Sequence, residues 1–220
     1  TALGRAVARL AASVHRLPRP LRGGKQWRQA LAVAGVRCDG VSSRALVLNL
    51  PLRGDAPAVA FCGAVPGEPV WLPLRALAGR LSAPVGTEVF VCENPTVLEA
   101  AADEFGARCP AMVCTGGMPT VTVLDLLGAL ADSGCVIAVR ADIDEAGLRI
   151  VEQVRSVAPS ATLWRFDARV YAHYLDPPEA GTDDAGLTGL RSVYQHHGVP
   201  LHEERLLDDL LLDLRRAARS

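Results

Sequence analysis

Three acidic residues of this 220-residue sequence follow two apolar segments, and their type and spacing suit metal-assisted chemistry. Glu93 directly follows the segment 88–92, and Asp142 and Asp144 form a D-x-D pair directly after the segment 135–141. Two carboxylates that flank one residue in an extended chain can point the same way and share a hard cation. Because neighbouring carboxylates repel one another, a divalent ion would neutralise them, and it could activate water for attack on a phosphodiester. We therefore expect Glu93, Asp142 and Asp144 to be metal ligands and catalytic residues, with Mg²⁺ or Mn²⁺ as the cofactor.

A structural role for the same acids stays open. Asp144 precedes an expected helix, where its side chain could cap the first turn, and Asp142 and Glu93 could be ordinary acids at strand ends. Two further acids could approach the same place. Glu145 could add a fourth ligand, and Glu203 could reach the metal from the start of the last helix, although the helix dipole favours acids in any first turn.

Four residues beside these strand ends could contact a DNA phosphate. Thr115 and Gly116 lie between an expected strand and an expected helix, where backbone N–H groups can face an anion or simply form a tight turn. Arg140 and Arg149 flank the D-x-D pair. Either arginine could bind phosphate, or it could be a surface residue paired with a nearby acid.

The elements that would position these residues alternate between strand and helix. Near-continuous apolar runs predict strands that are covered on both faces, and helical spacing of apolar residues separates them. The expected strands are 88–92, 111–115, 135–141 and 162–166, and the expected helices are 96–105, 120–131 and 145–157. This order predicts an α/β fold with a mostly parallel sheet flanked by helices, in which functional residues gather at the carboxyl ends of the strands.

The first part of the chain predicts a smaller mixed module. It contains expected helices at 2–17 and 27–34, an expected strand at 45–50 and a short helix near residue 81, followed by a Pro- and Gly-containing segment at 83–86. We therefore divide the chain into a basic amino-terminal module and linker, residues 1–85, and a catalytic domain with a carboxy-terminal helix, residues 86–220. In the second part, a loop at 176–186 and helices at 187–196 and 202–216 complete the chain.

The charge of the chain is unevenly distributed. Residues 1–38 contain eight arginine and lysine residues and no acidic residue, so this segment carries +8 while the whole chain carries −1. Such a basic segment is typical of a surface that binds a polyanion such as nucleic acid. A solvated helix face or a connector between domains would explain the same charge.

Composition excludes several classes of protein. A chain with 50% hydrophobic and 21% charged residues is neither disordered nor collagen-like, and its apolar runs are far shorter than the ~20 residues of a membrane span. The six cysteines are scattered, which disfavours a zinc site and favours reduced thiols in a cytoplasmic protein. The sequence begins at Thr1 without a charged-then-apolar leader, so we expect no export signal.

The segments around the acids resemble the Toprim domain, the metal-binding α/β module of topoisomerases, primases and several nucleases. These segments are 88–95, 114–117 and 141–150. Together with 164–167 and 202–210 they resemble more closely the bacterial DUF2399 family, over approximately residues 68–214. Members of that family resemble the nuclease subunit of the Wadjet plasmid-defence system.

The resemblance implies a magnesium-dependent endonuclease that cleaves double-stranded plasmid or phage DNA in a defence complex with a condensin-like SMC ATPase, and it allows for a homodimer. Glu93 would be the Toprim glutamate, and Asp142 and Asp144 its D-x-D pair, which together hold one or two magnesium ions. The family usually has an aromatic residue between or after the acids, where this sequence has Ile143 and Glu145. No phosphate-binding loop of the G-x-x-x-x-G-K-[ST] type is present, so ATP use would belong to another subunit.

Two other functions remain open at this point. The chain could be a non-catalytic DNA-binding or scaffold subunit with a Toprim-shaped domain, although three intact acids argue against a degenerate site. It could also be a magnesium phosphohydrolase that acts on a small phosphate ester, but such enzymes commonly use a nearby lysine, and the single lysine is Lys25. The three tyrosines all follow the α/β core, so we expect no covalent tyrosine–DNA intermediate.

Overall fold

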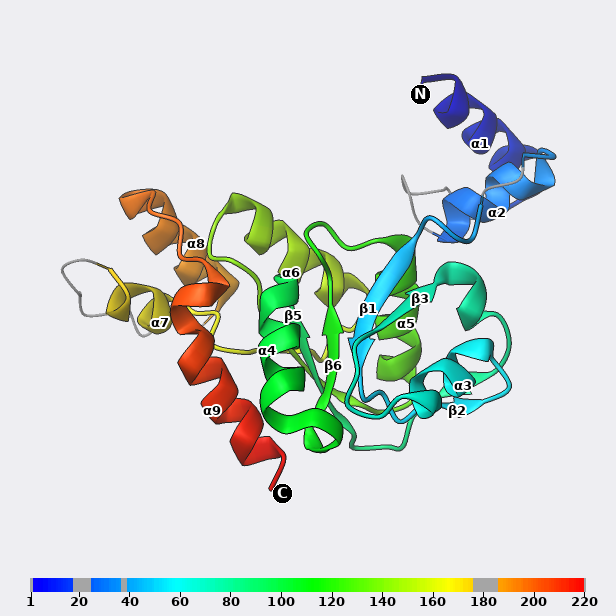
Figure 1. Cartoon of the computed structure of the whole chain (residues 1–220). Coiled ribbons are helices and arrows are strands. Elements are labelled where there is room, and N and C mark those ends of the chain that lie inside the picture. The colour runs from blue at the N-terminus through cyan, green and yellow to red at the C-terminus, as the bar shows by residue number, and fades with distance from the viewer. Residues whose placement is uncertain (1, 18–24, 37–38, 176–185, 220) are drawn as a thin grey trace.

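A computed structural model describes residues 2–17, 25–36, 39–175 and 186–219 of the chain (Figure 1). Its centre is a six-stranded sheet with the strand order β3-β1-β6-β5-β7-β8. The strands are β1 (Arg44–Leu48), β3 (Val70–Pro73), β5 (Glu88–Cys92), β6 (Ala111–Cys114), β7 (Val136–Val139) and β8 (Thr162–Leu163). The strands β6, β5, β7 and β8 pair in parallel, and β1 is antiparallel to both of its neighbours. The expected α/β fold with a mostly parallel sheet is therefore confirmed.

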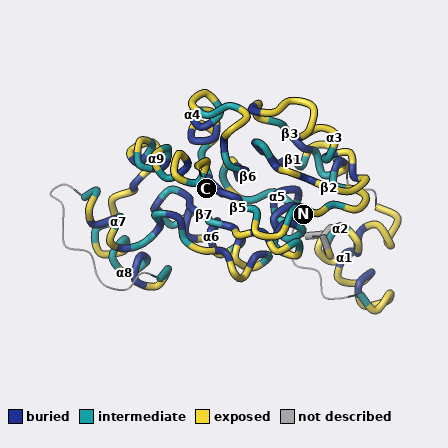
Figure 2. The backbone as a smooth tube through the Cα atoms, turned by 90° about the horizontal axis from the view of Figure 1, so that it is seen from below, coloured by how far each residue is buried: buried dark blue, intermediate teal, exposed yellow. Residues whose placement is uncertain are grey.

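Helices cover both faces of this sheet, as the apolar strands require. Figure 2 shows α4 (Pro95–Phe105) and α9 (Leu207–Ala217) on one side of the strands, and α5 (Val121–Asp132) and α6 (Glu145–Val157) on the other. The four residues of β6 are all buried, and so are the last four residues of β5. Beyond the edge strand β8, α7 (Ala168–His173) packs against α8 (Leu187–His197).

The amino-terminal part of the chain contributes to this sheet and also forms a separate pair of helices. In β1, Leu46 lies opposite Cys114 of β6, so β1 and β3 extend the sheet and share its apolar core. The sheet therefore continues across the expected boundary at residue 85. In contrast, α1 (Ala2–Val14) and α2 (Lys25–Val33) pack on each other around Ala8, Ala12 and Ala30 and extend away from the sheet (Figure 1).

Smaller elements connect β1 to β5. They are a two-stranded sheet of β2 (Arg53–Gly54) and β4 (Leu81–Ser82), the helix α3 (Pro57–Ala64) and the 3₁₀ helix η1 (Leu74–Leu77). The strand β3 and the helices α3 and α7 were not expected from the sequence, because each is short and lacks a clear apolar period. Most of the expected loop 176–186 lies outside the described residues.

The end of the chain differs from the expected helix at 202–216. A 3₁₀ helix, η3 (Glu203–Leu206), comes first, and the α-helix α9 begins only at Leu207. Just before η3, Leu201 forms an isolated bridge with Ile143, through backbone hydrogen bonds of 2.9 and 3.2 Å. Tertiary contacts hold the chain at this point and bring residues 201–204 against the strand ends.

Candidate functional site

Glu93 and Asp142 lie side by side at the carboxyl edge of the sheet. Each follows one of two neighbouring parallel strands, β5 and β7, in which Val91 lies opposite Val139. The backbone N–H of Asp142 donates a hydrogen bond of 3.1 Å to Oε2 of Glu93, although the two residues are 49 positions apart in the sequence. Strand pairing thus brings these two candidate residues together, because neighbouring parallel strands end at the same edge of the sheet.

Asp144 lies next to this pair and caps the helix α6. Its Oδ1 accepts a hydrogen bond of 2.7 Å from the N–H of Gly147, which is the capping role that the sequence left open. A side chain at position 147 would not fit, because a Cβ there would lie 1.8 Å from the carbonyl oxygen of Asp142. The first turn of α6 is therefore pressed against the backbone of the D-x-D segment, and Gly147 permits this contact. We call Glu93, Asp142 and Asp144 the acidic edge.

Burial and crowding act on the ionisation of Glu93. Partial burial raises its pKa, and the negative charges of Asp142, Glu203 and Asp144 raise it further, whereas the hydrogen bond from the Asp142 backbone lowers it. The resulting pKa is about 7. Glu93 can therefore take up or release a proton near neutral pH, and perturbed carboxylates of this kind are typical of functional sites.

Arg140 is paired with an acid, which is one of the two alternatives that the sequence left open, and it is not exposed to DNA. Its side chain is completely buried and forms an ion pair with Glu203, with Nε 2.9 Å from Oε1. A charge without exposure must be paired, because an isolated buried ion is very costly. The sequence does contain a signal for this role, since Arg140 stands between the buried residues Val139 and Ala141, where an exposed side chain is not expected.

Glu203 contacts both strand ends of the acidic edge. Its carboxylate accepts hydrogen bonds from the backbone N–H groups of Glu93 and Asn94, and its own N–H donates to Oδ1 of Asp142 at 2.8 Å. Burial raises its pKa, although Arg140 and the backbone donors act in the opposite direction. The sequence left two roles open for Glu203: an approach to this edge, or an acid that stabilises the first turn of the last helix. Its contact with the strand ends could not be predicted, because no local pattern links the last part of the chain to them.

His202 also belongs to this site. Its side chain is exposed, and its Nδ1 lies 2.8 Å from Oδ2 of Asp142. This hydrogen bond and the charge of Asp142 raise the pKa of His202. Both carboxylate oxygens of Asp142 therefore have protein partners, His202 at one and the N–H of Glu203 at the other.

The turn after β6 does not offer the anion-binding backbone that was considered for Thr115 and Gly116. Their N–H groups donate to the carbonyl oxygens of Cys92 and Glu93, at 2.9 and 3.0 Å. Thr115 is buried, and Gly116 has a φ of +61° in the left-handed region. The alternative of a tight turn is thus the one observed, and the turn supports the Glu93 backbone instead of binding phosphate through these N–H groups.

Arg149 and Glu145 lie on the first two turns of α6, and Arg149 remains open to solvent. Arg149 pairs with Glu145 at 3.1 Å, and its side chain is 63% exposed. Glu145 also lies 3.6 Å from Arg191 of α8. Glu145 is therefore neutralised by arginines on the helix surface, while Arg149 keeps the exposure that a phosphate contact requires.

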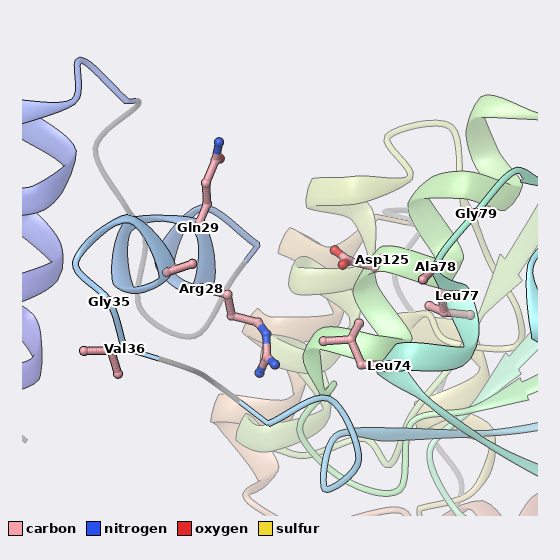
Figure 3. A pocket seen from close by; sticks show the side chains of 10 residues that line it. Arg28, Gln29, Gly35, Val36, Leu74, Leu77, Ala78, Gly79 and Asp125 are labelled. Carbon is pink, nitrogen blue, oxygen red and sulfur yellow. The ribbon is translucent and has the colours of Figure 1, made fainter.

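A cavity of about 1180 Å³ lies between α2 and η1 (Figure 3). Arg28 and Gln29 of α2 line one side, Leu74 and Leu77 of η1 line the other, and Asp125 of α5 also contributes. No residue of the acidic edge lines this cavity. The acidic edge is therefore separate from this cavity.

The acidic edge suits Mg²⁺ in its chemistry, since its three members supply carboxylate oxygens, which hard cations prefer. In the part of the chain that the structure describes, no group of three or more His, Cys, Asp or Glu side chains already has the arrangement of a metal site. A cation at Asp142 would have to replace His202 or share the carboxylate with it. The residues therefore fit a cation in type, and their side chains must reorient to hold one.

The mostly parallel sheet and the acids at its carboxyl edge define an α/β protein with a candidate cation-binding edge. The chain belongs to the family described as "Protein of unknown function C-terminus (DUF2399)", whose model matches residues 70–214. The matched range begins in β3 and ends in α9, so it contains the acidic edge, Arg140 and Glu203. No curated protein matches the sequence. Among the described residues, no helix combines the length and the apolar character needed to cross a membrane.

Proposed function

We propose that this chain is a metal-dependent DNA endonuclease that hydrolyses phosphodiester bonds, with Glu93, Asp142 and Asp144 as ligands of Mg²⁺ or Mn²⁺. The observation that supports the proposal best is the direct hydrogen bond between Glu93 and the Asp142 backbone at the carboxyl edge of the sheet. Its second support is the pKa of Glu93, which partial burial and the nearby charges of Asp142, Glu203 and Asp144 raise to about 7.

The residues around this edge have distinct parts in the proposed reaction. A bound divalent ion would supply stabilisation of the negative charge that develops on the phosphate, and a lower pKa of bound water. Glu93 would bind the ion as an ionised carboxylate, and Asp144 would keep α6 in place through its cap. Arg149, exposed on α6, would contact a DNA phosphate and so orient the backbone.

The amino-terminal helices would increase the affinity for DNA. Arg5, Arg9 and Arg16 are exposed on or directly after α1, in the segment that carries the positive charge of the chain. Because the acidic edge repels phosphate, a basic surface elsewhere on the chain would compensate for this repulsion. Binding through such contacts would weaken steeply as the salt concentration rises.

The finer assignment follows the resemblance to Toprim proteins and to the Wadjet nuclease subunit. On that basis the substrate would be double-stranded plasmid or phage DNA. The partners would be condensin-like SMC subunits of a defence complex, and the chain could form a homodimer within it. Support from the chain itself is limited to its family, its sheet and the acids at the carboxyl edge.

A non-catalytic DNA-binding or scaffold subunit is the second candidate. The observation that favours it is that His202 and the N–H of Glu203 already occupy both carboxylate oxygens of Asp142. In such a subunit the acidic edge would hold residues 201–204 in place and would not bind a cation. Binding of DNA through the basic helices would then be independent of Mg²⁺.

Plasmid cleavage separates the two candidates. The full chain is incubated with supercoiled plasmid and Mg²⁺ or Mn²⁺, and nicked and linear products are measured for the parent, Glu93→Ala and Asp142→Ala. Glu99→Gln is the matched control, because Glu99 is an exposed acid on α4 outside the site. We expect cleavage by the parent and the control and at least a hundredfold loss in the two site variants, with circular dichroism to show that they remain folded. DNA binding without cleavage, unchanged in Asp142→Ala, would support the second candidate.

A further inference from the structure

Glu203 is the buried centre of the contacts that join the last part of the chain to the acidic edge. Its side chain has no solvent exposure. One carboxylate oxygen, Oε1, accepts from Nε of Arg140 at 2.9 Å, and the other, Oε2, accepts from the N–H of Asn94 at 2.6 Å. Both oxygens also lie 3.1–3.2 Å from the N–H of Glu93. The carboxylate thus binds the backbone at the end of β5 directly.

The backbone of Glu203 makes the complementary contact with the second strand end. Its N–H donates to Oδ1 of Asp142, which follows β7. Glu203 is 110 residues from Glu93 and 61 residues from Asp142 in the sequence. It therefore connects two acids that follow different strands. Glu203 therefore adds a second connection between Glu93 and Asp142, beside the pairing of β5 with β7.

Neighbouring contacts hold residues 201–204 in the same place independently of this carboxylate. Leu201 bridges Ile143, the residue between the two D-x-D acids, and Oε1 of Glu204 accepts from Nδ2 of Asn94 at 2.6 Å. The segment is thus attached to the end of β5 and to the D-x-D segment after β7. Because it contacts both ends, a shift of this segment would move the two acids apart.

We propose that Glu203 is a positioning residue of the acidic edge, which fixes the backbone of Glu93 and the side chain of Asp142 relative to each other and thereby sets the cation affinity of the edge. Its effect on the cation rests on the proposed function, whereas its effect on the strand ends does not. A buried ion pair adds little net stability compared with an apolar pair of similar size. The acceptor oxygens toward Glu93 and Asn94, rather than the charge paired with Arg140, are therefore the feature that this position requires.

Two double variants isolate those acceptor oxygens. Arg140→Met with Glu203→Gln removes both buried charges but keeps one carbonyl oxygen that can accept from the Asn94 N–H. Arg140→Met with Glu203→Met is equally neutral and similar in shape, but it offers no such acceptor. The two variants therefore differ in the acceptor oxygen and in the amide NH₂ of glutamine, which only donates and cannot replace an acceptor for the Glu93 and Asn94 N–H groups. If the second variant does not fold, Arg140→Leu with Glu203→Leu replaces it, because apolar pairs commonly substitute for buried ion pairs.

Amide exchange and manganese binding are measured on both variants and on the parent. We expect the methionine variant to lose at least tenfold in the exchange protection of the Glu93 and Asn94 amides, recorded without metal. We also expect its Mn²⁺ affinity, from calorimetry, to fall about tenfold, as for other residues that orient metal ligands. The glutamine variant should remain within about threefold of the parent in both measurements. In plasmid cleavage, the methionine variant should need more Mn²⁺ while keeping most of its rate at saturating Mn²⁺.

The outcomes distinguish this inference from the proposed function. Unchanged amide protection in the methionine variant would overturn the inference, and so would lost protection combined with unchanged Mn²⁺ affinity. Equal losses in the two double variants would also overturn it, because they would assign the effect to charge and not to the acceptor. If the parent neither binds Mn²⁺ nor cleaves DNA while protection is lost only in the methionine variant, the proposed function fails and the positioning of the strand ends stands.

Discussion

Two groups of carboxylates in this molecule have opposite electrostatic surroundings. In the first, on α9, Asp213 accepts from Nη2 of Arg165 at 2.9 Å and from Nε1 of Trp164 at 3.1 Å, and Asp209 lies 3.5 Å from the same arginine. Burial alone would raise the pKa of Asp213, but the hydrogen bonds from Arg165 and Trp164 lower it below its usual value. We call this group the Arg165 cluster. At the acidic edge, in contrast, the pKa of Glu93 rises to about 7.

The two groups of carboxylates differ in which acids their arginines contact. In the Arg165 cluster two arginines face two carboxylates, because Arg165 contacts Asp209 and Asp213 and Arg216 lies 3.5 Å from Asp213. At the acidic edge Arg140 is close by but is paired with the buried Glu203, so its charge does not compensate Glu93, Asp142 and Asp144. The Arg165 cluster is thus complete within the protein, whereas the acidic edge has an excess of negative charge that an external cation could balance.

Removing each arginine tests this comparison with the largest expected effect. Arg140→Met leaves Glu203 buried without a counter-charge, and we expect a loss of about 3–5 kcal/mol in the free energy of unfolding. Arg165→Met leaves Asp213 partly exposed to water, so its loss should be about 1–2 kcal/mol. Urea denaturation at pH 7 measures both values. Equal losses would show that Arg140 and Arg165 have equivalent roles, which would contradict the comparison.

The next effect concerns the backbone of the acidic edge. Gly147→Ala would place a Cβ 1.8 Å from the carbonyl oxygen of Asp142, and we expect it to cost about 3 kcal/mol because the D-x-D segment must shift. Gly128→Ala on α5 is the matched control, since its Cβ would have no neighbour closer than 3.9 Å. Alanine is favoured over glycine in a helix, so the control should gain about 0.5–1 kcal/mol. Thermal denaturation of both variants gives the comparison, and a tolerated Gly147→Ala would show that α6 is not tightly packed against Asp142.

The sequence predicts the strands and helices around the acidic edge well, because their signals are local. The segment 88–92 is apolar after its first residue and forms β5, and the helix expected at 145–157 matches α6. Continuous apolar runs predict buried parallel strands, and adjacent strands of one parallel sheet must end at the same edge. The closeness of Glu93 and Asp142 could thus be anticipated from two strand assignments.

The contacts that complete the site could not be predicted in the same way. Glu203 reaches both strand ends over 110 and 61 residues, and no local pattern specifies a contact of that range. The segment expected to begin the final helix at 202 forms the 3₁₀ helix η3, and the α-helix begins at Leu207. For Arg140, its position inside a buried apolar run was the available signal, and it indicates pairing instead of DNA contact.

The pH dependence of stability should have opposite signs in the two groups. The pKa of Glu93 is raised in the folded chain from its usual 4.5 to about 7, so the folded state loses stability as the pH rises from about 4.5 to 7. Glu93→Gln should therefore stabilise the protein at pH 8, by about 1–2 kcal/mol after allowance for solvent access, and should have little effect at pH 4.

Asp213→Asn should have the reverse effect. The folded-state pKa of Asp213 is lowered, so its contribution to stability is present above its unfolded pKa of about 3.8 and is lost as the pH falls through the folded value. We expect a destabilisation of about 1–2 kcal/mol at pH 8 that is lost as the pH falls below 3.8 and through the lowered folded-state pKa. Urea denaturation of Glu93→Gln and Asp213→Asn between acidic pH and pH 8 measures how the stability of each variant relative to the parent changes with pH. A Glu93→Gln variant that is less stable than the parent at pH 8 would show that the acidic edge carries no excess of negative charge.

The smallest expected effect concerns the partner that occupies Asp142. His202 holds Oδ2 of Asp142 at 2.8 Å from an exposed position, and its raised pKa keeps it protonated to a higher pH than usual. Its contribution to stability is thus present below pH 6.5 and is lost as the pH rises through the folded pKa.

Because a cation must replace or share this contact, His202→Ala should increase Mn²⁺ affinity by about two- to fivefold at pH 6, as expected for an exposed ion pair, and by less at pH 8. His196→Ala on α8, another exposed histidine, should leave the affinity unchanged at both pH values. If His202→Ala instead weakened Mn²⁺ binding, His202 would be a ligand and not a competitor, and the acidic edge would extend into residues 201–204.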